Sequence, residues 1–589
     1  MSTDFDVVVC GGGLAGLTFA RQIRRDHPAF SVAVVEKTAR PLPEAGHKVG
    51  ESTVELGSQY LGRLGLRDYL HERHLIKFGL RFFPGGGHLP IEERIEIGPI
   101  NQPVVSSYQI DRGRFESDLR DMVVDEDGVR LFEGATVRDY AIGPGDTPHH
   151  VEVETQEGRV ELSARWLVDA TGRAGLLRGR MKLKRGGKHE ANAGWFRIKG
   201  RFDINTLASD GSQRFMQVPE GQDRWLSTNH LMGEGYWVWL IPLASGYTSV
   251  GVVAHEHVHP FETVKDLEAV QAFLRTHEPQ LAEALADAEV LDFRCLRRYC
   301  HTVSRCWHPD RWALIGEAGA FTDPLYSPGT DYIALANSFT AEMIQTDVEN
   351  GDLLARSQEL NAQYRALVSG SIGVYRESAA VYGHPGAMST KVFWDNHVYW
   401  SFPCQFFQQN IYRLSGEALM PFTLVGARFV ELSGRMQDVL KYWAEHVEPS
   451  FGGGDMVVVP AFPSMLVDSH CALTRKLSHA ETLSYMQAQL AAGEELFAEI
   501  VLRVTLELGP IAARHMWDEL GIREWGLSLP EGRVAAEELD GRARRRALPS
   551  VSRDIERALG MPRQSTFSVA EVGRWMTDRP AEPRARAEA

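Results

Sequence analysis

The pattern of apolar positions predicts a strand, a tight turn, a helix and a second strand at the start of the chain. Phe5 to Cys10 is a short Val-rich run, which is typical of a parallel strand buried on both faces. Apolar positions at helical spacing follow, and a second apolar run, Val32 to Val35, ends at Glu36. The chain therefore opens as an α/β protein.

Later segments extend this pattern. Buried strands are predicted at Arg165 to Gly172 and at Trp312 to Gly316, strand-like alternation runs from Trp195 to Val253, and a helix is predicted from Tyr332 to about Val348. From there to about Met576 the pattern is mainly helical.

These elements predict an α/β fold with three parts. A Rossmann-like nucleotide-binding module over residues 1–345 contains an inserted β-sheet at about 186–300, which we expect to contact the substrate. A mainly α-helical C-terminal domain covers 346–576. Residues 577–589, rich in Pro, Ala and charge, form a predicted disordered tail.

The turn after the first strand carries glycines at G-x-G-x-x-G spacing, namely Gly11, Gly13 and Gly16. The first glycine permits the tight turn, the second lets a pyrophosphate approach the backbone, and the third lets the helix pack on the strand. Glu36, at the end of the second strand, is placed to accept hydrogen bonds from ribose hydroxyls. The sequence therefore predicts a dinucleotide site, although such a turn alone also occurs without a ligand.

Composition excludes several classes of function. The 589 residues are 43% hydrophobic and carry a formal net charge of −15, which argues against general binding to nucleic acid or anionic membrane. The six cysteines show neither a metal-binding nor a disulfide spacing. No run of 18 apolar residues and no signal peptide is present, so we expect a cytoplasmic protein without an integral membrane segment.

Three separated turns resemble those of the FAD-dependent monooxygenase superfamily of the p-hydroxybenzoate hydroxylase type. They are the glycine turn, the D-A-T-G turn from Asp169 to Gly172, and the G-E-A-G turn around Glu317. The resemblance implies that Asp169 and Gly172 lie beside the FAD pyrophosphate, Glu317 near the ribityl chain and Arg112 near the isoalloxazine. Most members carry Asp where Glu317 stands.

Further motifs resemble the flavin-dependent halogenase family. Trp237 and Trp239 lie in a W-x-W-x-I-P motif, Phe321 to Gly329 fits F-x-x-P-x-x-S-x-G, and V-G-E-S-T precedes Lys77, which stands where halogenases carry a catalytic lysine. Without these motifs, the two tryptophans also fit a hydrophobic core strand, and Lys77 fits a lysine that extends to solvent.

The resemblance implies a specific chemistry. Reduced FAD and dioxygen give a flavin hydroperoxide, halide attacks it, and the resulting hypohalous acid reaches the substrate through Lys77. An ammonium could polarise the acid, and a desolvated neutral amine could form a haloamine. Trp237 and Trp239 would form a barrier between substrate and flavin. The substrate would be an electron-rich aromatic or another unsaturated molecule.

Two residues depart from the halogenase pattern. Tyr326 stands where tryptophan halogenases carry Glu, which disfavours free tryptophan as substrate. Ser327, Pro328 and Gly329 form the turn that the family uses for halide and flavin, and Pro328 has no backbone N–H. One hydrogen-bond donor to the halide should therefore be missing.

Two other segments leave alternatives open. The aromatic-rich segment Lys391 to Phe407 is interpreted as hydrophobic core rather than as a pocket. The basic segment Arg173 to Lys188 is interpreted as a solvated loop, although it could also dock an acidic carrier protein with a tethered substrate, or a nicotinamide phosphate. No second G-x-G-x-x-G unit appears, so we expect a separate flavin reductase as partner.

The sequence therefore predicts an FADH2-dependent halogenase that acts on a small or carrier-tethered aromatic substrate. Two alternatives remain: a flavin-dependent monooxygenase that hydroxylates its substrate on the same scaffold, and a non-catalytic flavin-binding assembly protein. No metal-binding motif is present.

Overall fold

A computed structural model describes residues 3–42, 50–209, 224–448, 458–459, 463–562 and 566–577. The predicted tail lies, from residue 578 on, outside the described residues. The mixed α/β class with a helical C-terminal part is confirmed. The division into domains stays a prediction.

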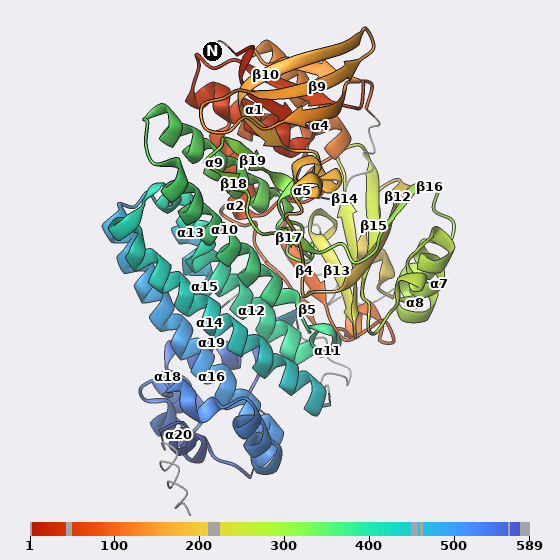
Figure 1. Ribbon diagram of the computed structural model, residues 1–589. Helices are drawn as coiled ribbons and strands as arrows, with labels where there is room; N and C mark the ends of the chain where they lie inside the picture. Colours follow the sequence, from red (N-terminus) through yellow and green to blue (C-terminus); the bar gives the residue numbers. More distant parts are fainter. Residues whose placement is uncertain are drawn as a thin grey trace, which may run out of the picture.

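The N-terminal part forms a sheet at the top of Figure 1. Its central strands are parallel and highly buried, as the Val-rich runs predicted. Helices α1 (Leu14–Asp26), α4 (Arg112–Asp125) and α9 (Gly329–Val348) pack against one another beside it. The strand order is β18 (Trp307–His308), β19 (Trp312–Leu314), β10 (Gly158–Asp169), β1 (Phe5–Cys10), β2 (Val32–Glu36) and β7 (Arg130–Glu133), with β8 (Thr136–Ala141) and β9 (His149–Thr155) joined to β10.

A second sheet lies at the right of Figure 1, with α7 (Leu267–His277) packed on β12. Part of it contributes Val, Phe, Leu and Ile side chains to a separate hydrophobic core. The strand order is β16 (Val290–Leu296), β12 (Ala191–Lys199), β15 (Tyr247–His255), β14 (Tyr236–Pro242), β13 (Thr228–Gly233), β4 (Leu80–Phe83), β5 (Glu96–Ile97) and β20 (Val458–Val459).

The second sheet is wider than the insertion at 186–300 that the sequence predicted. β4 pairs in parallel with β13, so a strand from before the insertion extends the sheet. β3 (Leu75–Lys77) lies just before β4 and pairs antiparallel with β6 (Ser107–Gln109). This arrangement places Lys77 at the end of β3, opposite Ser107 of β6 and just before β4 of the second sheet.

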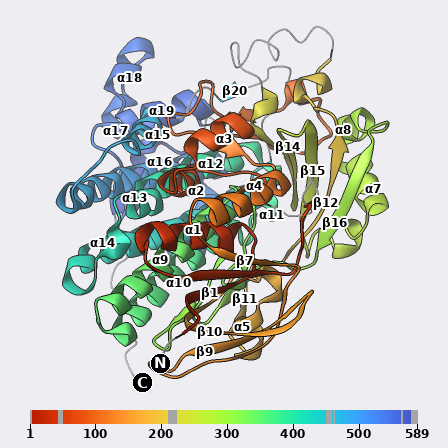
Figure 2. The same ribbon diagram turned by 90° about the horizontal axis from the view of Figure 1, so that it is seen from above.

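Long helices cover the lower left of Figure 1, and Figure 2 shows the same helices from above. They pack mainly on one another, with α14 in contact with α10, α12 and α16. Their bounds are α10 (Leu353–Tyr375), α12 (Pro385–Ser401), α13 (Pro403–Gln408), α14 (Gly416–His446), α15 (Ser464–Ala472) and α16 (His479–Glu519).

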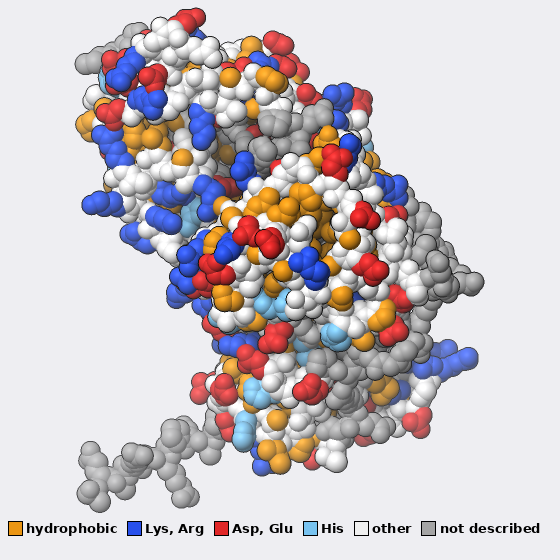
Figure 3. All heavy atoms as spheres, turned by 90° about the vertical axis from the view of Figure 1, so that its right-hand side faces the viewer, with side chains coloured by type: hydrophobic (Ala, Val, Ile, Leu, Met, Phe, Trp, Pro, Cys, Tyr) orange, Lys and Arg blue, Asp and Glu red, His pale blue; other side chains and the backbone are white. Residues whose placement is uncertain are grey.

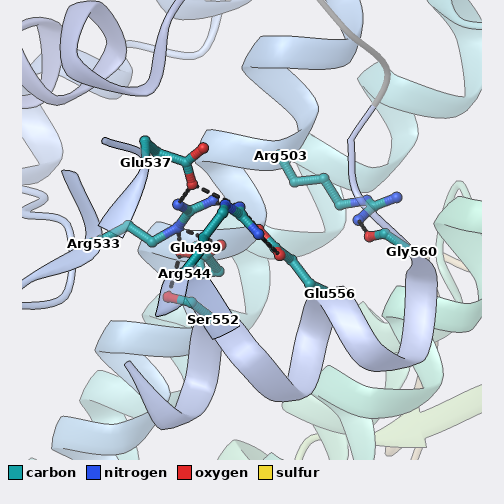
Figure 4. A network of polar contacts seen from close by, with 8 residues as sticks. All are labelled: Glu499, Arg503, Arg533, Glu537, Arg544, Ser552, Glu556 and Gly560. Carbon is teal, nitrogen blue, oxygen red and sulfur yellow. Dashed lines mark hydrogen bonds and ion pairs between the residues drawn. The ribbon is translucent and has the colours of Figure 1, made fainter. Parts of the chain in front are cut away.

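The last helices are joined to α16 by buried ion pairs (Figure 4). Arg533 Nε lies 3.1 Å from Glu499 Oε1 of α16, and Arg533 Nη2 lies 3.1 Å from Glu556 Oε1 of α19 (Ser550–Leu559). Arg544 of α18 (Gly541–Ala547) lies 2.6 Å from the same oxygen of Glu556. Removing one member of such a buried network leaves an uncompensated charge, so this network holds the C-terminal helices in place.

On the face that carries α7 and α8 (Pro279–Ala284), acidic and basic side chains are interspersed (Figure 3). Among the residues that the structure describes, no helix is both long and apolar enough to cross a bilayer.

Candidate active site

The three turns of the predicted dinucleotide site meet at one edge of the first sheet. Cys10 pairs in register with Asp169, and Asp169 pairs with Leu314, so β1, β10 and β19 end side by side. The glycine turn, the Asp169 turn and the Glu317 turn therefore begin next to one another. In open parallel sheets, ligands bind outside these carboxyl ends.

The glycine turn has the backbone that a dinucleotide requires. Gly11 has φ +116°, a conformation that favours glycine, and a Cβ at Gly16 would overlap the Gly11 carbonyl. Gly13 precedes α1 with φ −86°, and its turn has no side-chain cap. Glu36 accepts a hydrogen bond from Gly12 N–H at 2.7 Å, so its carboxylate faces the turn.

The Asp169 turn is held by its own side chain. The carboxylate accepts hydrogen bonds from Thr171 N–H at 2.9 Å and from Leu177 N–H at 2.7 Å. Gly172 follows with φ +61° and with open space around its Cα, as a site beside a ligand requires. Asp169 therefore shapes this turn, and its predicted contact with a pyrophosphate stays a prediction.

Glu317 and Arg112 come from different sides of this edge. Glu317 lies half-buried in the short 3-10 helix Gly316–Ala318, and Arg112 begins α4 and lies 2.6 Å from Glu116. Arg178, from the segment interpreted as a solvated loop, is buried and donates to the Glu317 carbonyl at 2.8 Å. The solvated-loop interpretation is wrong for Arg178, because α5 (Leu176–Arg180) packs its guanidinium against the Glu317 turn.

A small pocket of about 50 Å³ lies between the V-G-E-S-T segment, the second sheet and the start of α9. Trp237 and Trp239 of β14 are buried and line it, so they are at once core residues and pocket wall. Ser327, Pro328 and Gly329 line the pocket at the N-terminus of α9. Ser327 has φ +57°, and a Cβ at Gly329 would meet open space. The helix N-terminus is thereby open to the pocket.

Residues 50–53 of the V-G-E-S-T segment are anchored to the second sheet by hydrogen bonds. Glu51 is buried, and its Oε1 accepts a hydrogen bond from Arg197 Nε of β12 at 2.8 Å. Ser52 forms a bridge with Gln109 of β6, and its Oγ lies 3.0 Å from Thr228 Oγ1. Ser52 therefore holds a fixed place in the wall of the small pocket.

Lys77 is fully buried and reaches this same wall. Its Nζ donates to Ser52 Oγ at 2.8 Å and to the Thr53 carbonyl at 2.9 Å. Burial lowers the pKa of the Lys77 amine to about 7, although the carboxylates of Glu55 and Asp331 favour the charged form. The amine can therefore hold or release a proton near neutral pH. Lys77 does not extend to solvent, so that alternative is excluded.

A large cavity of about 680 Å³ begins at Lys77. Pro328 and Tyr332 line both this cavity and the small pocket, so the two spaces share a wall at the start of α9. Apart from a few polar groups, the lining is apolar and comes from α9, α10, α12, α14, α15 and the loop at 99–104.

Four polar residues that sequence reasoning did not select join Lys77 in the cavity wall. Asp331 accepts from Tyr399 OH at 2.7 Å and from Gly57 N–H at 2.8 Å, and burial raises its pKa to about 7 against these bonds. Glu55 lies 3.2 Å from His470 Nε2; burial raises the Glu55 pKa, but the hydrogen bond and charge of His470, a backbone N–H and the charge of Lys77 together lower it more.

Two of these four carried a signal in the sequence. Glu55 stands two residues after the V-G-E-S-T segment, and Asp331 stands two residues after the halide turn. Tyr399 and His470 carried none, because they reach the cavity only through the packing of α12 and α15.

The aromatic segment Lys391 to Phe407 divides between core and cavity. Phe393 and Trp394 are buried in the core, as interpreted, but Tyr399, Phe402 and Phe406 line the cavity. The core interpretation is wrong for Tyr399 and Phe402, which are only partly buried, whereas Phe406 belongs to both the core and the cavity wall.

Tyr326, at the position of the family's glutamate, also lines the cavity. It donates to Asp395 Oδ2 at 2.8 Å, and Lys391 Nζ lies 3.0 Å from that oxygen. The carboxylate near this position thus comes from α12 and is neutralised by a buried lysine.

The residues present fit FAD: the turns need glycine where a pyrophosphate would approach, Glu36 faces the turn, and the small pocket lies beside them. The fold and this site define an FAD-dependent oxidoreductase. A profile described as tryptophan halogenase matches residues 91–370. The flavin-dependent halogenase chlA of Dictyostelium discoideum is 27% identical over 67% of this chain and 70% of its own.

A second relative and a solved structure are also similar to this chain. The 1H-pyrrole-2-carbonyl-[peptidyl-carrier protein] chlorinase of Pseudomonas fluorescens is 26% identical over 78% of this chain and 99% of its own. Halogenase PltM, solved in complex with phloroglucinol and FAD, shares the fold with a TM-score of 0.57 at 15% identity, over 83% of this chain and 96% of that one. The chain is similar to members of the flavin-dependent halogenase family.

Proposed function

We propose that the protein passes a hypohalous acid from the small pocket to Lys77, which delivers it to an electron-rich aromatic substrate in the large cavity. One observation carries this proposal: Lys77 lies in the cavity wall and donates to Ser52, which lies in the wall of the small pocket. Reduced FAD, when bound, would activate dioxygen and so supply the oxidant that converts halide to hypohalous acid.

The residues of the three turns would hold the cofactor. The backbone at Gly11, Gly13 and Gly16 would take the pyrophosphate at the start of α1, with Glu36 on a ribose. Asp169 and Gly172 shape the neighbouring turn. Glu317 would lie near the ribityl chain and Arg112 near the ring.

The small pocket separates substrate from cofactor. Trp237 and Trp239 would exclude an aromatic substrate from it, because a volume of about 50 Å³ holds no ring. A halide is small enough to enter. The N-terminus of α9 would favour the anion with the backbone N–H groups from Gly329 onward, although Pro328 supplies none.

The pKa values of Lys77 and Asp331 suit two steps: the capture of hypohalous acid at Lys77 and the loss of a proton from the substrate. As an ammonium, Lys77 would donate to the oxygen of the hypohalous acid; as a neutral amine, it could accept the halogen. Asp331, with its pKa near 7, would take the proton that the ring or its hydroxyl loses. Glu55, paired with His470, would help to retain positive charge at Lys77.

The substrate class follows from this electrophilic chemistry and from relatives. Phloroglucinol occupies the solved PltM complex, and the Pseudomonas chlorinase acts on a carrier-bound pyrrole. We therefore propose a phenol or a comparably electron-rich ring, and a separate reductase as the source of reduced flavin.

The test is product analysis with FAD, a flavin reductase, dioxygen and bromide against phenols, pyrroles and carrier-bound acids. We expect brominated product from the wild type and none from Lys77→Ala, with flavin oxidation equally fast in both. Brominated product from a folded Lys77→Ala variant would contradict the proposed route.

Pro328 favours a second candidate, hydroxylation of the same substrate. If the missing N–H leaves the halide too weakly held, oxygen transfer to the substrate would compete. Oxygenated product formed without added halide would support this candidate.

A further inference from the structure

We propose that the substrate carries a hydrocarbon chain of several carbons, with its ring at Lys77 and its chain in the channel between α10, α12 and α14. This inference deepens the proposed function and relies on it only for the identity of the ring. The chain itself is inferred from the shape and chemistry of the cavity beyond the ring.

Apart from the Asp395–Lys391 pair, the charged groups of the cavity gather at one end. Lys77 interacts electrostatically with Glu55 and Asp331, Glu55 pairs with His470, and Asp331 bonds Tyr399. The third carboxylate of the lining, that of Asp395, is already paired with the Lys391 ammonium and accepts a hydrogen bond from Tyr326 OH. A polar, reactive head group therefore belongs at the Lys77 end.

From Tyr399 the cavity continues along apolar surfaces to the outside. One turn further along the chain, Phe402 lines it, and a Cβ at Gly426 of α14 would overlap the Phe402 ring. Beyond this contact, Gly370 of α10 faces Val430 of α14, whose side chain is 46% exposed. The cavity is thus buried at Lys77 and open between α10 and α14.

Small side chains keep this opening wide. Ala366 of α10 and Ala427 of α14 line the cavity and are exposed. A larger side chain at either position would narrow the passage.

The volume supports a substrate longer than one ring. A cavity of about 150 Å³ is large enough to bind benzene. The volume of about 680 Å³ is more than four times as large. A single ring at Lys77 would leave most of this apolar space without contacts.

The lining favours hydrocarbon over the arm of a carrier protein. A pantetheine arm carries two amides and a phosphate, which need polar partners when buried. Among the described residues of the lining, no arginine is present, and the lysine and the histidine both lie at the ring end. Between α10, α12 and α14 most of the lining is aliphatic and aromatic, and its uncharged polar side chains are Gln363, Ser369, Ser371, Asn396, Thr423 and Ser433.

Binding of 5-alkylresorcinols tests this proposal without any turnover. We would measure Kd by calorimetry for resorcinol and its 5-propyl, 5-pentyl and 5-heptyl derivatives on the oxidised FAD-loaded protein. Each buried methylene is expected to tighten binding about two- to fourfold. An ether chain of equal length should bind much more weakly than heptyl.

Substitutions at the opening locate the chain. Ala366→Phe and Ala427→Phe should weaken 5-heptylresorcinol at least tenfold and leave resorcinol unchanged. Ala362→Phe is the matched control, since Ala362 is exposed on the same helix α10 but does not line the cavity. This control should change neither ligand.

The outcomes separate the two proposals. An affinity that is independent of chain length would overturn the chain proposal even if bromination occurs. Equal losses of affinity for resorcinol and 5-heptylresorcinol in Ala366→Phe and Ala427→Phe would overturn it as well. Tighter binding of a carrier-bound ring than of the free alkylated ring would overturn it too. Steep chain-length dependence without bromination would retain the chain proposal and refute the halogenase route.

Discussion

Lys77 and Ser52 connect two spaces that also share a wall at the start of α9. The Lys77 amine donates to the Ser52 hydroxyl at 2.8 Å; Lys77 lines the large cavity, and Ser52 lines the small pocket beside Trp237 and Trp239. The relationship depends on β3 pairing with β6, because that pairing brings Lys77 opposite Ser107 and beside the V-G-E-S-T segment.

FAD binding should depend on Gly13. Gly13→Val should abolish FAD binding, because a branched side chain would occupy the space of the pyrophosphate, whereas its φ of −86° allows the substitution to fold. FAD titration followed by flavin fluorescence measures this. Gly186→Val is the control, since Gly186 lies exposed on β11 (Lys184–Gly186) with open space around it. Unchanged affinity in a folded Gly13→Val protein would remove the basis of the assignment.

Halogenation should not tolerate arginine in place of Lys77. Lys77→Arg should give no halogenated product, because a guanidinium stays charged and fits neither the Ser52–Thr53 site nor haloamine formation. Product yield by mass spectrometry would be compared with Lys188→Arg, a change of an exposed lysine. Wild-type yield from Lys77→Arg would show that a fixed positive charge is sufficient.

Burial of Lys77 should make stability depend on pH. Its pKa falls from 10.5 to about 7 on folding, so the unfolded chain binds more protons between these values and stability rises with pH there. Lys77→Met should remove this rise and stabilise the protein by up to about 5 kcal/mol near pH 6, less at pH 10. Urea unfolding at pH 6, 8 and 10 tests it, with Lys188→Met as control. A pH-independent effect would contradict the lowered pKa.

Asp331 should act as a base. Its pKa near 7 means that the carboxylate form increases as pH rises through 7, so the halogenation rate should rise over the same interval. Asp331→Asn should lower kcat by about a hundredfold or more and remove this rise. Asp468→Asn, an exposed change on α15, should do neither. A wild-type pH profile in Asp331→Asn would exclude a proton-transfer role.

The sequence predicted the first sheet well and the cavity poorly, for a physical reason. Val-rich runs and glycine spacing are local, so β1, β2 and the turn at Gly11 follow from short stretches. The polar end of the cavity joins Glu55, Lys77, Asp331 and residues of α12 and α15, which are spread along the chain from position 55 to position 470. Only tertiary packing shows that Tyr399 bonds Asp331, or that α10 and α14 leave an opening.

For the motif residues, the sequence predicted which residues matter but not how they are packed. The pattern around Lys77 marked it as a candidate, but its full burial and its contact with Ser52 required the pairing of β3 and β6. Trp237 and Trp239 had two interpretations, core or barrier, and their strand satisfies both at once.

Pro328 should weaken halide binding. The missing N–H removes one hydrogen bond to the anion, which costs about 1.5–3 kcal/mol, or roughly ten- to a hundredfold in affinity. Pro328→Thr should therefore lower the bromide concentration needed for half-maximal rate and leave FAD affinity unchanged. The φ of −77° at this position accommodates threonine. An unchanged bromide requirement would show that this turn does not hold the halide.

The most direct test of the halogenase route is product identity and rate against bromide and chloride concentration, for the wild type supplied with FAD, reductase and dioxygen. The proposal predicts product that carries halogen, absent without halide and rising to saturation as halide is added. An oxygenated product formed at a rate independent of halide would contradict it and establish the hydroxylase instead.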